Sequence, residues 1–355
     1  MGNFTENIRS GAAYNMKSTV NTADFKSAID KLSKVCAAKS AVPSLKNISV
    51  SFTSDSLILR ATDLEQFAKI TLIAESDGNA NFTFSDTGTV LKAVKFFKSE
   101  LTEINFFPPE EEQATDANGE SYIRKIPGKI VLICGGKKAE QLISNESEYP
   151  DFPELKAAGT CEYSYTVQKL AQRVAAIKYA VGTNETNLVL TGIHFNNCDT
   201  VTCNGYRLAV NTDTEFTVEN AFTVPLKAIK SVTEILSGSL KISTDGKYIR
   251  FTDGAGNEVV SRLLDGKYMQ YSDYTSGERT DIQEAEVNVK SLTDGLKYLQ
   301  AFSANKSPTI WENDTLYIQT ASGKFESNID ILTETSPAKI CFSNAFMLDA
   351  FIRPV

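Results

Sequence analysis

The sequence has few of the residues from which catalytic and metal sites are most often built. Among its 355 residues there is a single histidine, His194, which lies in the apolar run Leu190–Phe195. One histidine leaves no multi-histidine metal site and argues against a histidine-dependent catalytic triad, although carboxylate or lysine chemistry stays open. We interpret His194 as a hydrogen-bonded residue of a β-strand.

Disulfide and membrane signals are also missing. The six cysteines are scattered without a C-x-x-C pair, a pattern typical of reduced thiols and not of a disulfide framework or a zinc site. No apolar run reaches the ~18 residues that span a bilayer, and residues 1–15 lack the apolar core of a signal peptide. We therefore expect a cytoplasmic protein in which residues 1–15 are an extension or leader before Met16.

The sequence does contain one pattern three times. In each copy a helix precedes two strands that meet at a short polar tip, and a second helix follows; the tips are residues 59–65, 201–207 and 318–324. The starts of the two helices are 64, 58 and 54 residues apart, so we predict three copies of one α+β unit. Apolar residues at helical spacing place the six helices at residues 22–39, 86–98, 167–179, 225–236, 289–301 and 343–351.

The repeat predicts three domains, at residues 16–155, 156–280 and 281–355. The first two copies continue for more than fifty residues after their second helix, whereas the third continues for four. We therefore expect the third domain to be truncated at its C-terminal end, with an exposed sheet edge, and this chain to dimerise poorly.

Three segments between these elements carry turn or loop signals. Asn204-Gly205 predicts a hairpin with a type I′ turn. The run from Gly135 to Lys138 lacks the spacing of a phosphate-binding loop and predicts another hairpin turn. Residues 108–128 are polar and acidic, and we expect a solvated loop there.

Charge is distributed unevenly. The net charge of −8 ordinarily counts against a nucleic-acid partner, but the six predicted helices hold 14 basic and 6 acidic residues, which leaves −16 for the rest. If the helices share a face, that face attracts polyanions. The alternative is that lysine is simply a good helix former on solvated faces. Because no base-reading module is present, any nucleic-acid binding should be sequence-blind and sensitive to salt.

Several short motifs resemble one family when taken in order. They are Ala61–Glu65, Leu190–Ile193 followed by Gly205–Ala209, and Leu264–Tyr268, and they resemble the bacterial β sliding clamp, the processivity subunit of DNA polymerase III, from residue 16 to about 351. The resemblance implies an α+β clamp fold and a head-to-tail homodimer that closes into a ring. Helices then line the hole, duplex DNA passes through without base readout, and DNA polymerase III and the clamp loader bind through short linear motifs.

The resemblance also implies three sets of site residues. Basic residues expected to face DNA are Lys26, Lys39, Lys92, Lys95, Lys169, Arg173, Lys227, Lys230 and Lys297. A partner-peptide pocket is expected from Leu190, Cys203, Asn204, Gly205, Tyr206, Arg207, Leu208, Met269 and Tyr274. Apolar contacts at the dimer junction are expected from Phe96, Phe97 and Phe302. The pocket departs from the usual pattern, because the family's Thr-Asp-Gly-His-Arg-Leu is replaced by Cys203–Leu208 and its carboxyl-terminal pocket strand has no counterpart.

Two other interpretations compete with the clamp. Asp63 and Glu65 could form a pair of carboxylates on one strand face, but neither has an evident partner, so we expect no catalysis, cofactor or metal. A divergent or inactive clamp-like module that does not close around DNA is the second alternative. Dimer formation and retention on circular DNA would separate it from a working clamp.

Overall fold

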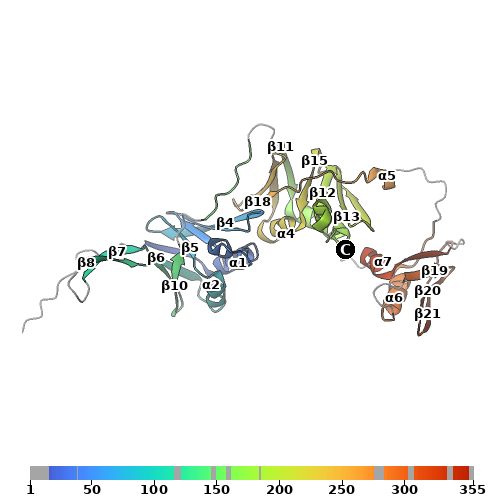
Figure 1. The fold of residues 1–355 in the computed structure, drawn as a ribbon, viewed down its shortest axis with the longest axis horizontal. Coiled ribbons are helices and arrows are strands. Elements are labelled where there is room, and N and C mark those ends of the chain that lie inside the picture. The colour runs from blue at the N-terminus through green and yellow to red at the C-terminus, as the bar shows by residue number, and fades with distance from the viewer. Residues whose placement is uncertain are drawn as a thin grey trace, which may run out of the picture. The chain divides into compact units, whose positions relative to one another are not determined.

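The computed structural model describes residues 16–37, 39–115, 121–144, 149–156, 161–183, 185–275, 284–302, 308–333 and 339–351. Residues 1–15, the predicted extension or leader, lie outside these ranges. The chain divides into two compact units, and Figure 1 labels the helices and strands of both. Unit 1 comprises Met1–Ala171 and Thr214–Leu264, and unit 2 comprises Gln172–Asp213 and Asp265–Val355.

The first repeat lies in unit 1 as a ring of antiparallel strands with two helices. The strands pair in the order β1-β6-β9-β10-β5-β2-β3-β4, and β4 pairs with β1 to close the ring. Phe82 stacks on Phe106 in its core, with 5.3 Å between ring centres. The elements are β1 (Met16–Asn21), α1 (Thr22–Ser33), β2 (Ser49–Phe52), β3 (Ser56–Thr62), β4 (Gln66–Ser76), β5 (Ala80–Phe84), α2 (Thr87–Val94), β6 (Leu101–Phe107), β9 (Lys129–Cys134) and β10 (Lys137–Ser144).

The same sheet continues into the second repeat. Strand β18 pairs with β4, with Glu258 opposite Lys69, and the order then runs β18-β17-β16-β11. Unit 1 therefore joins parts of two repeats through backbone hydrogen bonds. The elements of the second repeat in unit 1 are β11 (Cys161–Thr166), the first residues of α3 (Val167–Ile177), β15 (Val218–Pro225), α4 (Leu226–Ile235), β16 (Ser239–Thr244), β17 (Tyr248–Asp253) and β18 (Glu258–Arg262), and β15 is not a strand of this sheet.

The acidic segment 108–128 differs from its prediction as a loop. It contains two exposed strands, β7 (Glu110–Thr115) and β8 (Ser121–Ile126), which pair with each other. Cross-strand ion pairs hold opposite charges together, from Arg124 to Glu112 and from Lys125 to Glu111. Most side chains of β7 and β8 are exposed, as expected, but their backbone forms a β-ribbon.

Unit 2 holds the rest of α3, three strands of the second repeat, and the third repeat. Strands β12, β13 and β14 pair in sequence order, and the third repeat has a sheet in the order β21-β20-β19-β22 beside two helices. The elements are η3 (Lys178–Ala180), η4 (Glu185–Thr191), β12 (Gly192–Asn197), β13 (Asp199–Cys203), β14 (Leu208–Thr212), α5 (Ser272–Thr275), α6 (Val289–Gln300), β19 (Pro308–Glu312), β20 (Thr315–Thr320), β21 (Gly323–Asn328), β22 (Ile340–Ser343) and α7 (Asn344–Phe351).

The predicted α+β class and all six predicted helices are confirmed, but α1 ends at Ser33 and not at residue 39, and α2 ends at Val94 and not at residue 98. The Gly135-Gly136 turn is confirmed, with both glycines at positive φ. The type I′ turn at Asn204-Gly205 is wrong, because Cys203 pairs with Leu208 and the loop therefore has four residues. The domain boundaries and the truncation of the third domain stay predictions.

Candidate functional site

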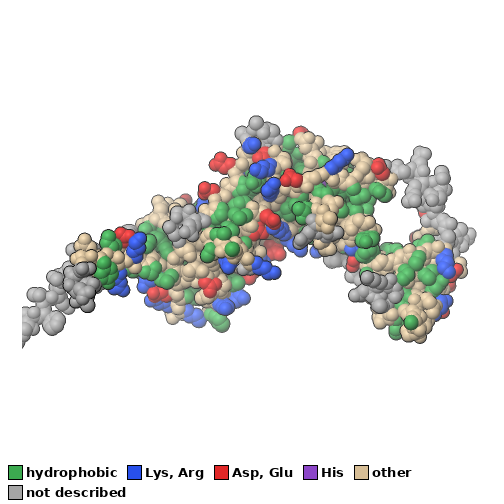
Figure 2. Space-filling model, in the orientation of Figure 1, with side chains coloured by type: hydrophobic (Ala, Val, Ile, Leu, Met, Phe, Trp, Pro, Cys, Tyr) green, Lys and Arg blue, Asp and Glu red, His purple; other side chains and the backbone are tan. Residues whose placement is uncertain are grey.

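Three helices of unit 1 lie together. Helix α1 contacts both α2 and α4, and Lys34 of α1 reaches Glu234 of α4 at 3.2 Å. Lys and Arg side chains line the edge of unit 1 on which Figure 1 places these helices (Figure 2). The layer is therefore shared by two repeats and rich in positive charge.

Several predicted lysines are exposed on or beside these helices. Lys39, Lys92, Lys95 and Lys230 are exposed, and no carboxylate of the described residues lies within ion-pair distance of their ammonium groups. Lys26 is half-buried and donates to the backbone carbonyl of Lys95 at 3.4 Å. Free ammonium groups on one layer can approach phosphates without breaking an existing pair.

The structure corrects the prediction for Arg173. It was expected to face DNA from α3, but it is buried, with 4% of its surface exposed. Its Nη2 donates to the backbone carbonyls of Cys198 and Asn211, the latter at 3.0 Å. A buried guanidinium needs such acceptors, so Arg173 ties α3 to strand β14 and to the turn between β12 and β13, and it is not exposed to a polyanion.

Two other predicted basic residues carry ion pairs, and a third is exposed. Lys169 pairs with Glu215 within unit 1. Lys227 pairs with Asp63 and Glu65, as described next. Lys297, on α6 of unit 2, is exposed, and its predicted role stays a prediction.

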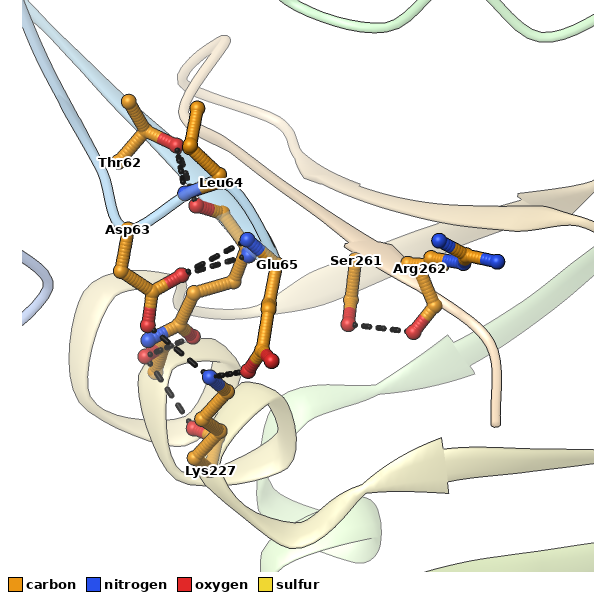
Figure 3. Close-up of polar contacts among 9 residues, drawn as sticks. Thr62, Asp63, Leu64, Glu65, Lys227, Ser261 and Arg262 are labelled. Atoms are coloured by element: carbon orange, nitrogen blue, oxygen red, sulfur yellow. Dashed lines mark hydrogen bonds and ion pairs between the residues drawn. The ribbon is translucent and has the colours of Figure 1, made fainter. Parts of the chain in front are cut away.

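Lys227 is held by the tip loop of the first repeat (Figure 3). The loop folds on itself, since Asp63 Oδ1 accepts hydrogen bonds from the backbone N–H groups of Glu65 and Gln66 at 3.1 and 2.9 Å. The other oxygen of Asp63 lies 3.1 Å from Lys227 Nζ, and Glu65 pairs with the same nitrogen. Burial lowers the pKa of Lys227, but its hydrogen bonds to Glu65 and Asp63 outweigh this effect and raise the pKa above its usual value.

This cluster also explains the two carboxylates. Asp63 and Glu65 neutralise a lysine at the junction between two repeats, so they are not free for acid–base chemistry. Leu64, between them, adopts φ 73° and leaves 53% of its surface exposed. The motif at residues 61–65 thus links the first repeat to helix α4 of the second. Because its ammonium group is already paired, Lys227 is less available to DNA than the exposed lysines.

A second ionic cluster lies on the strand side of the same junction. Glu258 of β18 is buried, and its carboxylate oxygens lie 2.7 Å from Lys69 Nζ and 2.7 Å from Arg250 Nε. Arg250 also donates to the backbone carbonyl of Pro153 at 3.1 Å. Backbone pairing and buried charge therefore hold the two repeats of unit 1 together.

Four residues of the predicted partner pocket meet in unit 2. Cys203 is buried in a cluster with Val189, Val201, Tyr268 and Tyr271, and Leu190, Leu208 and Met269 pack against it. His194 lies in β12, stacked on Tyr268 with 4.2 Å between ring centres. Burial lowers the pKa of His194 to about 4, so its imidazole is neutral near pH 7.

The polar residues of the predicted pocket lie in the four-residue tip loop 204–207. Asn204 Oδ1 accepts from the backbone N–H groups of Tyr206 and Arg207 at 3.0 and 2.9 Å, and Gly205 has φ +86°. Tyr206 has 86% of its surface exposed, and Tyr274 on α5 has 70% exposed. The loop therefore presents an aromatic ring and a guanidinium beside the apolar cluster.

Arg207 also contacts three residues that the sequence did not single out. Its guanidinium lies over the rings of Phe346 and Tyr179, at 4.1 and 5.3 Å, and Nη1 is 2.5 Å from Asp349. Phe346 and Asp349 belong to α7, more than 130 residues away in the chain. The only sequence signal related to this contact is that a polar tip and a following helix recur in each repeat.

The predicted dimer residues fall into two groups. Phe97 is buried in the first repeat, with 3% of its surface exposed, so it is a core residue and not an interface contact. Phe96 is 67% exposed, and Phe302 is 40% exposed while it stacks on Phe325 with 4.3 Å between ring centres. Phe96 and Phe302 stay predictions.

The described ranges contain neither a metal-binding cluster nor a membrane-spanning helix. His, Cys, Asp and Glu side chains there do not gather in threes that could hold a metal ion. Among the helices of the same ranges, none has the length and apolar character needed to cross a bilayer.

Comparison with family models matches two parts of the chain. Residues 16–109 match the N-terminal domain of the DNA polymerase III beta subunit, and residues 165–270 match its central domain. The two matches together cover more than half of the chain. The ribbon β7–β8 lies between them.

Relatives agree with these matches. The beta sliding clamps of Staphylococcus epidermidis and Staphylococcus aureus are each 25% identical, over 274 and 273 residues, which is 71% of this chain. The chain spans 66% of the length of these curated relatives, just under two thirds.

Solved structures show the same fold. The DNA polymerase III beta subunit of Thermotoga maritima has a TM-score of 0.75 at 21% identity, covering 95% of this chain and 89% of its own. The Bacillus subtilis sliding clamp has 0.77 at 16%, covering 95% and 90%. The Bartonella birtlesii sliding clamp, bound to griselimycin, has 0.78 at 18%, covering 95% and 89%. These likenesses confirm the predicted clamp fold.

Proposed function

Because the chain belongs to the DNA polymerase III beta subunit family, the sliding clamps, we propose that it is a processivity factor that encircles duplex DNA without reading its sequence. In this proposal a head-to-tail homodimer forms the ring, in the cytoplasm, and this requires that the chain dimerise more stably than its short third repeat predicts. The clamp then tethers the replicative polymerase and is placed by a clamp loader, both bound through short linear motifs. It has no catalytic role.

The observation that carries this proposal is the helix layer of unit 1. Helices α1, α2 and α4 come from two repeats, yet α1 contacts both of the others, and Lys92, Lys95 and Lys230 are exposed there without carboxylate partners among the described residues. Duplex DNA carries one negative charge per roughly 1.7 Å of its axis. A layer of unpaired ammonium groups suits such a ligand, because it attracts phosphates without fixing a base sequence.

The apolar cluster around Cys203 supports the partner site. A cleft with hydrophobic walls and one guanidinium suits a peptide that has hydrophobic anchors and a polar or acidic group. We assign Leu190, Leu208 and Met269 to its walls and Arg207 to its polar end.

A clamp-like module that does not close around DNA is the second candidate. The burial of Phe97 and Arg173 favours it, because it removes one dimer contact and one DNA contact expected of a ring-forming clamp. The departures at Cys203–Leu208 also favour it, because they change residues expected in the partner pocket.

The salt dependence of duplex binding tests the helix layer. A variant with Lys92→Gln, Lys95→Gln and Lys230→Gln should bind a labelled duplex more weakly in fluorescence anisotropy. The slope of log affinity against log salt should fall by about 2 to 3, because each lost phosphate contact removes about 0.9.

The matched control removes three lysines from strands instead. Lys125→Gln, Lys241→Gln and Lys324→Gln change the net charge equally, on β8, β16 and β21. The slope of this control should stay near that of the unmodified protein. Equal losses in the two triple variants would show that total charge, and not the helix layer, governs binding.

A further inference from the structure

Arg207, in the tip loop of the second repeat, is occupied by an acid of its own chain. Its Nη1 lies 2.5 Å from Asp349 Oδ2, and its guanidinium lies 4.1 Å from the ring centre of Phe346. Tyr206 approaches the same ring, with 6.2 Å between ring centres. Helix α7 thus presents an aromatic ring and a carboxylate, three residues apart, to one guanidinium.

The guanidinium keeps unused donors. Arginine has five N–H groups in a planar fork that can bind a carboxylate through two hydrogen bonds. Arg207 Nε is buried and has no acceptor among the described residues, and 16% of the side chain is exposed. The contact with Asp349 therefore uses only part of the hydrogen-bonding capacity of Arg207.

The first repeat provides a comparison within the chain. Its tip loop also meets the second helix of the following repeat through an ion pair, in which Asp63 and Glu65 hold Lys227. There the loop supplies the acids, and Asp63 accepts further hydrogen bonds from its own loop. In the second repeat the signs are reversed, and the basic loop residue adjoins an exposed tyrosine and the apolar cluster around Cys203. The second junction therefore shares its charged residue with the proposed partner site.

We infer that Asp349 is a tethered competitor of partner peptides: it holds Arg207 while no partner is bound, and an acidic group of the partner replaces it. This inference rests on the proposed partner site. Binding of a partner then releases α7 from Arg207, and weakening the Asp349 contact raises the affinity for an acidic peptide. For one partly exposed ion pair the gain is roughly two- to five-fold in Kd.

The first arm of the test needs no partner. Asp349→Asn removes the carboxylate, and Asp294→Asn is the control, because Asp294 pairs with Lys290 on α6 of the same repeat and the net charge changes equally. Hydrogen exchange of the α7 amides should be faster in Asp349→Asn and in Arg207→Gln, and the double variant should exchange no faster than either. Exchange in Asp349→Asn equal to that in the unmodified protein would overturn the inference, since the contact would then be absent in solution.

The second arm uses a labelled hexapeptide, Ala-Leu-Glu-Leu-Phe-Ala, and its glutamine counterpart. Asp349→Asn should bind the glutamate peptide two- to five-fold more tightly than the unmodified protein does, and Asp294→Asn should not. The glutamine peptide should show no such gain. Equal affinities in the unmodified protein and Asp349→Asn would overturn the competition alone. No binding by any variant would overturn the partner site, and the inference with it.

Discussion

The junction between the two repeats of unit 1 should depend strongly on Glu258. Its carboxylate, 10% exposed, lies between Lys69 and Arg250, which are 28% and 33% exposed. Replacing one partner of a buried ion pair costs about 3–5 kcal/mol. The two cations can regain water, and Arg250 Nε is in ion-pair contact without hydrogen-bond alignment, so we expect Glu258→Gln to cost about 2–3 kcal/mol.

Thermal unfolding measures this cost. A unit of 150–250 residues loses about 2–4 °C in Tm per kcal/mol, so the unit 1 transition should shift down by about 4–12 °C. Glu162→Gln is the control, because Glu162 pairs with Lys241 on the same sheet and is 58% exposed; it should change stability by less than about 0.5 kcal/mol. A Tm for Glu258→Gln that equals the control would refute the importance of this buried pair.

Three further changes have defined outcomes. Lys227→Gln should leave duplex affinity in anisotropy within about two-fold of the unmodified protein, because its ammonium is already paired; a loss as large as that of Lys92→Gln would contradict this. Gly135→Ala should destabilise unit 1 by about 1–2 kcal/mol in urea unfolding, because a Cβ at φ +52° would lie 2.2 Å from Ser99 Oγ. Gly254→Ala is the control and should be nearly neutral, because a Cβ there meets open space. His194, with a folded pKa of about 4, stays neutral while the unfolded chain takes up a proton below pH 6.5. Stability should therefore fall as the pH drops, by about 2 kcal/mol at pH 5, and His194→Gln should lose that part of the slope.

The regular elements could be predicted because they bury one face. Helix α6 buries Leu292, Leu296 and Leu299, and this spacing is visible in the sequence. The ribbon β7–β8 could not be found in this way, since both of its faces are exposed and its residues show no alternation. The Asn204-Gly205 turn was assigned the wrong type because Gly205 alone, and not Asn204, has positive φ.

Site residues were harder to predict than elements, because charge in a sequence does not reveal the partner. Arg173 and Lys230 both look like basic helix residues, yet one is buried against backbone carbonyls and the other is exposed. Lys227 is more than 160 residues from Asp63 and Glu65 in the chain, and only the folded junction brings it to them. The packing of Leu190, Cys203, Leu208 and Met269 in one cluster could be predicted from the family motif, whereas the contact of Arg207 with Asp349 could not.

Topological retention on DNA tests the clamp proposal most directly. Linear plasmid is incubated with the protein, circularised by ligase, and passed through gel filtration at a salt concentration that abolishes ionic binding. The proposal predicts that the protein elutes with the ligated circle and is released when a restriction enzyme cuts the circle once. Equal retention on circular and cut plasmid, or none on either, would contradict it.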